Sequence, residues 1–186
     1  VEAAVRVYTC NEGSGTLSVI DPTTDAVIAT TPVQSRPIRL VATPDGKKIY
    51  VSNSAGNSVS VIDTSSNKVI ATIPTGKRPS ELAVTPDGTQ LFVSNESNAT
   101  VSVISTLTDS VITNVPTDVS PTQIQITPNG LLAYVGSRGG NILTVIDAIS
   151  HNVVASIRMG ASPRRLLVTK DGHRVYVGNT GVGTVT

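Results

Sequence analysis

Short apolar segments alternate with polar turns along the whole chain, and none of them is long enough for a helix. In the middle of the sequence four such segments follow one another, at 82–84, 91–93, 101–104 and 111–115. Each has the length of a strand, and β-branched residues, which favour pleated structure, are abundant in them. The turns between them are rich in Ser, Asn, Thr and Gly. This pattern predicts an all-β fold of short strands.

The four-strand pattern repeats every 42 residues without an insertion or a deletion. One aromatic position and one proline position mark the repeat most clearly. The aromatic residues are Tyr8, Tyr50, Phe92, Tyr134 and Tyr176, and the prolines are Pro37, Pro79, Pro121 and Pro163. Four antiparallel strands in about 42 residues are typical of one propeller blade. The predicted fold class is therefore all-β, a β-propeller built from four-stranded antiparallel blades.

Asp-Gly or Asn-Gly pairs at 45–46, 87–88, 129–130 and 171–172 separate the first two strands of each unit. Such pairs close tight hairpins because Gly and Asn tolerate a positive φ. Hairpins favour antiparallel blades over a stacked β-helix, which remains as an alternative. Leucine-rich, ankyrin and tetratricopeptide repeats are excluded because they are shorter or helical.

We expect a single propeller domain or fragment over 1–186, with repeat units 8–49, 50–91, 92–133, 134–175 and a partial unit 176–186. This amounts to about 4.4 blades, and the last unit stops inside its third strand, at Val185 and Thr186. A closed ring protects its sheet edges by mating the last blade with the first. We therefore expect part of a larger ring, with seven blades as one candidate number. A complete four-bladed ring and an open arc that dimerises are the alternatives.

One tetrapeptide recurs at the second strand of the units. Its copies are Tyr50-Val51-Ser52-Asn53, Phe92-Val93-Ser94-Asn95, Tyr134-Val135-Gly136-Ser137, Tyr176-Val177-Gly178-Asn179 and the weaker Tyr8-Thr9-Cys10-Asn11. With the V-S-V-I-D strand and the T-P-D-G turn, these copies resemble the YVTN-repeat family of β-propellers over nearly the whole chain. The resemblance implies a ring that typically has seven blades, and a surface-layer or secreted protein that serves adhesion or display. It implies an extracellular or cell-surface location, with the periplasm as an alternative, and carries over no catalytic residue.

Charge and composition narrow the function classes. Fourteen Lys and Arg against 13 Asp and Glu leave a net charge of +1, which gives no field that would attract nucleic acid. No stretch approaches the roughly 20 apolar residues of a membrane span. The single Cys10 cannot form an internal disulfide, and two distant histidines cannot hold a metal alone. No cofactor and no metal are predicted, and the absence of Trp argues against stacking of a quinone.

The candidate site lies beside the proline positions. The first strand of a blade is the innermost in a propeller, so residues entering it surround the mouth of the central channel. These positions vary while the rest of the repeat stays constant, and variation on a constant scaffold sets recognition. The candidate ligand-binding residues, named the mouth below, are Arg36, Arg39, Arg78, Glu81, Gln123, Arg164 and Arg165. Six cations against one acid at these positions and their neighbours suit a carboxylate, phosphate or sulfated sugar. The alternative is a set of ordinary solvated loop residues.

Two other recurrent polar positions are interpreted as scaffold. Asp21, Asp63 and Asp147 precede Ser- or Thr-containing turns and are expected to cap them rather than to bind a metal. The asparagines at 11, 53, 95 and 179 are expected to satisfy loop backbone groups.

Catalytic motifs such as G-x-S-x-G, H-E-x-x-H and C-x-x-C are absent, so no catalytic residue is predicted. The predicted function is a non-catalytic interaction module of a secreted or cell-surface protein, with a protein, peptide or glycan partner, anionic ones included. The alternative is a lactonase-like or lyase-like propeller enzyme, with its site in the channel or in blades absent here. Glu81, Glu96 and His173 could then supply an acid or base. Self-association, in which the repeat assembles with copies of itself, is a third hypothesis.

Overall fold

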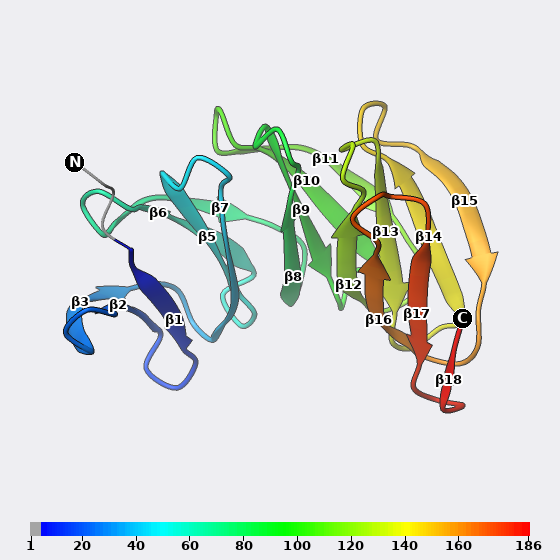
Figure 1. The fold of residues 1–186 in the computed structure, drawn as a ribbon, viewed down its shortest axis with the longest axis horizontal. Helices are drawn as coiled ribbons and strands as arrows, with labels where there is room; N and C mark the ends of the chain where they lie inside the picture. The colour runs from blue at the N-terminus through cyan, green and yellow to red at the C-terminus, as the bar shows by residue number, and fades with distance from the viewer. Residues whose placement is uncertain (1–4) are drawn as a thin grey trace.

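The computed structural model describes residues 5–186, and all regular secondary structure in that range is β-strand. Eighteen strands form five antiparallel sheets that follow one another along the chain. The three central sheets have four strands, and the first and last have three. Figure 1 shows the sheets set side by side along an arc from the N-terminus to the C-terminus. Each sheet is one blade, and the chain is a partial β-propeller, as predicted.

The blades are numbered in chain order. Blade 1 consists of β1 (Val7–Asn11), β2 (Thr16–Asp21) and β3 (Ala26–Pro32). Blade 2 consists of β4 (Pro37–Ala42), β5 (Lys48–Asn53), β6 (Ser58–Asp63) and β7 (Lys68–Pro74). Blade 3 consists of β8 (Pro79–Val84), β9 (Gln90–Asn95), β10 (Thr100–Ser105) and β11 (Ser110–Pro116). Blade 4 consists of β12 (Pro121–Ile126), β13 (Leu132–Ser137), β14 (Ile142–Asp147) and β15 (Val153–Arg158). Blade 5 consists of β16 (Pro163–Val168), β17 (Val175–Asn179) and β18 (Thr184–Val185).

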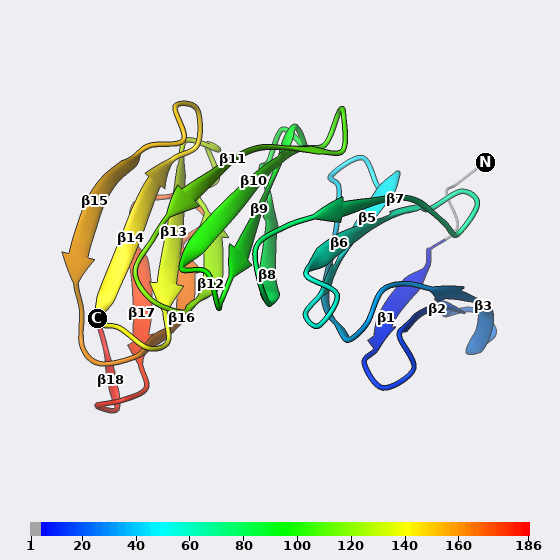
Figure 2. The ribbon, with the colours of Figure 1, turned by 180° about the vertical axis from the view of Figure 1, so that it is seen from behind.

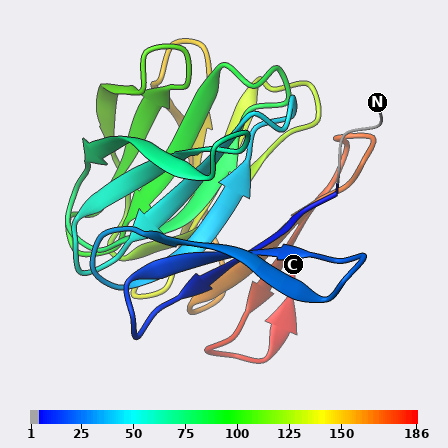
Figure 3. The same ribbon diagram turned by 90° about the vertical axis from the view of Figure 1, so that its left-hand side faces the viewer.

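Strand order within every blade is the order along the chain, so each neighbouring pair is an antiparallel hairpin. The first strands of blades 2 to 5 pack against one another in succession, β4 on β8, β8 on β12 and β12 on β16. They form the inner edge of the arc. The view from behind in Figure 2 brings later strands of the blades, among them β7 and β11, to the front. In Figure 3 blade 1 is nearest to the viewer, seen from the N-terminal end of the arc.

In blades 2 to 5 the hairpins between the first two strands close as the Asp-Gly and Asn-Gly pairs predict. In blade 2, Gly46 has φ +69° and its amide donates to the carbonyl of Thr43 at 2.9 Å. The equivalent glycines of blades 3 to 5 have φ of +72° to +74°, a left-handed conformation that an L side chain would strain. Antiparallel pairing in all five sheets excludes the β-helix alternative.

The hydrophobic core lies between blades rather than within them. Because side chains alternate across a strand, each sheet presents one apolar face to the blade before it and one to the blade after it. The interface of blades 2 and 3 is representative. Its buried residues are Tyr50, Val59, Val61 and Ile73 from blade 2 and Leu82, Leu91, Val93 and Ile104 from blade 3. Similar clusters join the other successive blades, with Phe92 buried between blades 3 and 4.

The aromatic residue that recurs every 42 positions is buried in blades 2 and 3 but partly exposed in the last blade. Tyr50 and Phe92 are 0% exposed, whereas Tyr176 of the last blade is 42% exposed. Blade 5 is followed by no further sheet in the structure of residues 5–186, so the face that carries Tyr176 has nothing packed against it there. Within the same residues no helix is long and apolar enough to cross a membrane.

This difference gives a stability prediction for two residues at the same position of the repeat. Phe92→Ala removes a ring buried between two blades and should lower the free energy of unfolding by about 3–5 kcal/mol. Tyr176→Ala, the matched control on the uncovered face, should lower it by less than about 1 kcal/mol. Urea denaturation followed by circular dichroism measures both. Equal losses would contradict a core formed by blade-to-blade packing.

Candidate functional site

The inner strands begin with the same irregularity in blades 2 to 5. Pairing with the second strand shifts register directly after each proline, between Pro37 and Arg39 in blade 2 and between Pro163 and Arg165 in blade 5. Blades 3 and 4 repeat this bulge between Pro79 and Leu82 and between Pro121 and Gln123. A β-bulge bends the strand and redirects the side chains beside it. The variable residues of the mouth sit at this bend.

The residue before each proline holds the loop in place. Arg36, Arg78, Ser120 and Ser162 all have a left-handed backbone, with φ between 52° and 60°. Each of their carbonyls accepts a backbone hydrogen bond from the residue after the second strand, for example Ser54 N to Arg36 O at 2.8 Å. Non-glycine residues adopt this conformation only where the surroundings enforce it. The backbone of the mouth is therefore fixed, and its side chains are what changes from blade to blade.

The residues two positions after the prolines form polar contacts from one blade to the next. Arg39 Nε lies 3.7 Å from Glu81 Oε2, which joins blades 2 and 3. Arg165 Nη1 donates to Gln123 Oε1 at 3.5 Å, which joins blades 5 and 4. The structure thus pairs four of the mouth residues across the inner edge of the arc.

A hollow of about 250 Å³ opens at the mouth, around the inner strands of blades 2 and 3. We call it the mouth hollow. Its polar lining residues are Glu12, Arg36, Arg39, Ser80, Glu81 and Thr122. The hydroxyl of Thr122 is buried and has no hydrogen-bond partner among the described residues. The hollow therefore presents cations and carboxylates together, which suits a polar ligand with several hydroxyl or carboxylate groups.

Two acids that the sequence analysis did not assign to the mouth change its charge. Glu12 Oε1 lies 2.6 Å from Arg36 Nε, and Glu96 lies 3.2 Å from Arg78 and 3.9 Å from Arg138. Glu96 follows the second strand of blade 3, whose last residue, Asn95, pairs with Pro79 of the inner strand. Because Arg78 precedes Pro79 and Glu96 follows Asn95, this pairing could have been used to predict from the sequence that Glu96 lies beside Arg78. Glu12 belongs to the preceding blade, and its position needs the blade-to-blade geometry.

The cations of blade 5 are different. Arg164 and Arg165 are exposed, and neither forms an ion pair within residues 5–186. Net positive charge at the mouth is therefore concentrated on β16, while the mouth hollow holds two arginines paired with two glutamates.

Glu81 is the titratable group of the mouth whose environment perturbs it most clearly. Burial raises the pKa of its carboxyl above the ordinary value of 4.5, although Arg39, the amide of Leu82 and Arg165 act in the opposite direction. Its side chain is 21% exposed, so it faces the mouth hollow with limited access to water. A carboxyl with a raised pKa in a hollow can bind a ligand hydroxyl or exchange a proton.

The recurrent aspartates cap turns, as predicted. Asp21 Oδ1 accepts from the amide of Thr23 at 2.9 Å, and Asp147 Oδ1 accepts from the amide of Ser150 at 2.7 Å. Hydrogen bonds from Ser65 and Ser66 lower the pKa of Asp63 to about 2. In the described part of the chain no three His, Cys, Asp or Glu side chains cluster as metal ligands would.

The prediction for the recurrent asparagines was wrong. Their side-chain amides do not satisfy loop backbone groups but donate to hydroxyls on the third strand, for example Asn53 Nδ2 to Ser58 Oγ at 3.2 Å and to Ser60 Oγ at 2.9 Å. Asn95 makes the same two bonds to Thr100 and Ser102. These positions therefore tie the second strand to the third.

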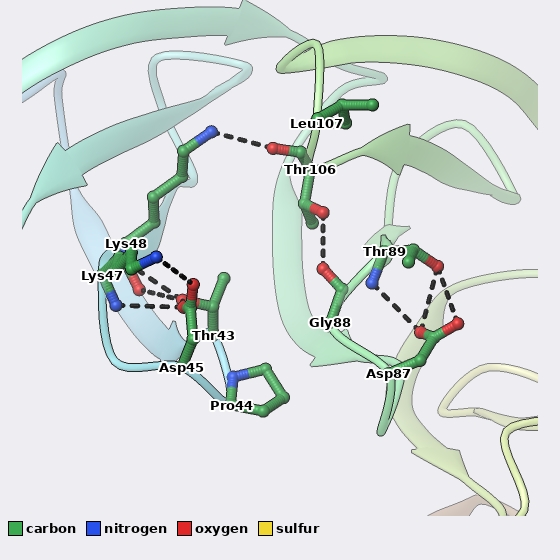
Figure 4. A pocket seen from close by; sticks show the side chains of 10 residues that line it. All are labelled: Thr43, Pro44, Asp45, Lys47, Lys48, Asp87, Gly88, Thr89, Thr106 and Leu107. Carbon is green, nitrogen blue, oxygen red and sulfur yellow. Dashed lines mark hydrogen bonds and ion pairs between the residues drawn. The ribbon is translucent and has the colours of Figure 1, made fainter.

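A second hollow of about 470 Å³ lies on the opposite face, between the turns of blades 2 and 3 (Figure 4). Its polar groups are occupied by local bonds. Asp45 accepts from Thr43 and from the amide of Lys47, and Asp87 accepts from Thr89. Lys48 Nζ donates across the gap to the carbonyl of Thr106 at 2.8 Å. These contacts stabilise turns and join blades, so the mouth is the better candidate for a ligand.

Comparisons with protein families agree with the fold. The model described as "Lactonase, 7-bladed beta-propeller" matches residues 1–120, and a model for YNCE-like β-propellers matches residues 81–174. Each covers more than half of the chain. The chain belongs to the family of seven-bladed β-propeller lactonase-type proteins, with a YNCE-like match over its later blades. A search of curated proteins found no match.

Two solved structures resemble the arc closely. The hydrazine synthase of Kuenenia stuttgartiensis has 26% sequence identity and a TM-score of 0.83, with 92% of this chain and 51% of that chain covered. A functionally unknown protein from Desulfotomaculum acetoxidans has 20% identity and a TM-score of 0.82, with 97% of this chain and 64% of that chain covered. This chain thus spans about half of the first structure and under two thirds of the second.

The raised pKa of Glu81 gives a prediction for stability against pH. The folded state holds the proton of Glu81 more tightly than the unfolded state, so this residue makes stability fall as pH rises from about 4.5 through the folded pKa. Glu81→Gln should remove this decline, and urea midpoints of the two proteins between pH 4 and 8 measure it.

Arg39→Gln is the companion variant. Arg39 stabilises the charged form of Glu81. Its removal should therefore extend the fall in stability with rising pH to higher pH values. If the urea midpoints of the wild type and Glu81→Gln changed with pH in the same way, Glu81 would have the same pKa in the folded and unfolded states. That result would contradict the prediction.

Proposed function

We propose that this chain is a non-catalytic interaction module of a β-propeller protein and that its mouth binds an acidic glycan. The observation that carries the proposal is the concentration of variable polar side chains at the inner edge of a constant scaffold. Polar residues from four successive blades line the mouth hollow, and Arg164 and Arg165 lie on the adjoining inner strand β16. Protein surfaces whose scaffold is constant place recognition in such positions.

The chemistry of the mouth favours a glycan with carboxylates over a simple polyanion. In the mouth hollow Arg36 and Arg39 are paired with Glu12 and Glu81, which offers neighbouring donors and acceptors to sugar hydroxyls. Arg164 and Arg165 have no carboxylate partner within residues 5–186 and can each grip a ligand carboxylate through two N–H groups. A uronic-acid chain carries both kinds of group.

The setting of the module is part of the proposal. The YVTN-like tetrapeptides support a secreted or cell-surface protein, with adhesion or display as the role of the glycan contact. The family description of seven blades supports a larger ring to which this arc would contribute. Its inner strands would then form part of the wall of a central channel.

A lactone hydrolase is the second candidate. The lactonase family match favours it, and so does Glu81, a carboxyl with a raised pKa beside a hollow, which could act as a general base for an attacking water. Under this alternative the protein would hydrolyse a small lactone, and Glu81→Gln would abolish turnover. Absence of turnover combined with glycan binding would favour the interaction module.

Binding to a uronic-acid oligosaccharide tests the first proposal. We expect Arg164→Ala with Arg165→Ala to weaken binding at least about tenfold, because two charge-assisted contacts are lost without loss of a folded contact in the core. The matched control is Lys68→Ala with Arg158→Ala, which removes the same charge from outer strands. Isothermal titration at two salt concentrations measures both pairs. Equal affinity in the two double variants would reject the mouth as the site.

A further inference from the structure

The outer edge of the arc is formed by β3, β7, β11 and β15, each the last strand of its sheet (Figure 2). We call them the outer strands. A last strand pairs on one side only, so it presents backbone N–H and C=O groups with which a strand of another molecule could pair. Blades pack on one another through their faces. A further blade at either end of the arc would therefore leave these edges as they are.

The outer strands have the composition of segments that pair readily with one another. Residues 69–73 read Val-Ile-Ala-Thr-Ile, residues 111–115 read Val-Ile-Thr-Asn-Val, and residues 153–157 read Val-Val-Ala-Ser-Ile. All three are rich in β-branched residues and none carries a charge. Segments of this kind on an exposed sheet edge promote β-aggregation. Copies of the chain could therefore join at this edge if its backbone were regular.

Each outer strand is instead interrupted by a β-bulge at the same repeat position. In blade 3, Val103 of β10 pairs with Thr113. The next residue of β10, Ile104, pairs with Val111, so one residue of β11 is left without a partner. A bulge bends the strand and breaks the regular spacing of its edge groups. The residues left out in this way are Ile28, Ile70, Ile112 and Val154.

Exposure of the bulged residue is the same along the arc. Their side chains are 46% to 55% exposed, in the interior blades 2 and 3 as well as in blades 1 and 4. The bulges are thus a constant feature of the outer edge.

The far end of the outer strands is interrupted as well. In blade 3 the amide of Thr117 donates inward to the carbonyl of Ala99 at 2.9 Å. Successive residues of a strand direct their backbone groups to opposite sides, so Pro116 faces outward, where its nitrogen has no hydrogen to donate. Blades 1 and 2 have a proline at the same place, and blade 4 has a charged residue. These residues are Pro32, Pro74 and Arg158.

Little regular edge remains between the two interruptions. In β11 it consists of Thr113, Asn114 and Val115. Of these, Asn114 alone faces outward, because its two neighbours share the inward direction of Thr117. One residue of the strand can therefore offer a regular N–H and C=O pair to another molecule, whereas strands in sheets usually pair over about five or six residues.

We propose that the bulge and the residue at the end of each outer strand together prevent copies of this chain from joining through their outer edges. Self-association by strand pairing along the outer edge is then closed to the native chain. A partner that docks on the outer edge must bind its side chains rather than extend its sheets. The mouth takes no part in this protection, so the proposal goes beyond the proposed function and stands independently of glycan binding.

Restoring a regular edge in blade 3 tests the proposal on the 186-residue chain. Deletion of Ile112 combined with Pro116→Thr removes both interruptions, and the residues on either side of the deletion keep their present partners on β10. This deletion variant should form assemblies that grow with concentration and raise thioflavin T fluorescence at least about tenfold above the wild type, because its edge can template another strand. Light scattering and fluorescence at matched concentrations measure the effect.

A second variant leaves the chain length and every register unchanged. Pro74→Thr with Pro116→Thr adds one outward donor to the edge of blade 2 and one to the edge of blade 3. Its fluorescence should lie between that of the wild type and that of the deletion variant. If the deletion variant does not fold, the two-proline variant alone decides the question.

Two controls separate edge pairing from other causes of aggregation. Ile112→Thr removes the exposed aliphatic side chain but keeps the bulge, and should behave as the wild type does. Phe92→Ala weakens the core of the same blade without changing its outer edge, and should also stay unassembled. Circular dichroism melting verifies that each variant is folded.

Three results would overturn the proposal. The first is that the folded deletion and two-proline variants stay unassembled. The second is that Ile112→Thr assembles although its bulge is intact. The third is that Phe92→Ala assembles as much as the deletion variant, which would assign assembly to lost stability rather than to the edge.

Discussion

The packing of each sheet on the next is the interaction on which the rest of this structure depends. A four-stranded sheet with two apolar faces cannot cover itself, so its stability comes from neighbours on both sides. Tyr50 and Phe92 are fully buried because a following blade covers them, while Tyr176 at the same repeat position is not. The unbroken 42-residue step follows from this requirement. A shift of one residue would turn every apolar side chain to the wrong face.

The mouth is a consequence of the same arrangement. Stacking blades around an arc brings their first strands together, and the bulge after each proline turns the next residues toward the inner edge. Residues such as Arg39 and Glu81 contribute little to the core, so they can vary without disturbing the blades. Under the proposed function, recognition and stability occupy different positions of the repeat, which would let one scaffold carry different ligand specificities.

Much of the fold could be predicted because its signals are local. Strand lengths, Asp-Gly turns and the aromatic period all lie within one repeat, and the turn-capping role of Asp63 needs only the residues that directly follow it. The mouth could be located but not its charge balance, since Glu12 and Arg36 belong to different blades. The asparagine contacts were missed because Asn53 bonds to side chains across the hairpin, five and seven residues away. The hydrogen bond from Tyr50 to Asp109 was missed for a related reason, because these two residues are 59 positions apart and meet only when blades pack.

Hydrogen exchange along the chain tests the dependence on neighbouring blades most directly. The amides of β9 and of β17 belong to the same strand of the repeat, but β9 lies in a blade covered on both faces and β17 in a blade covered on one. The account predicts that β9 exchanges at least about a hundredfold more slowly than β17, with protection falling from blade 3 toward both ends. Equal protection in β9 and β17 would mean that each blade is stable by itself, which would contradict the central role of blade-to-blade packing.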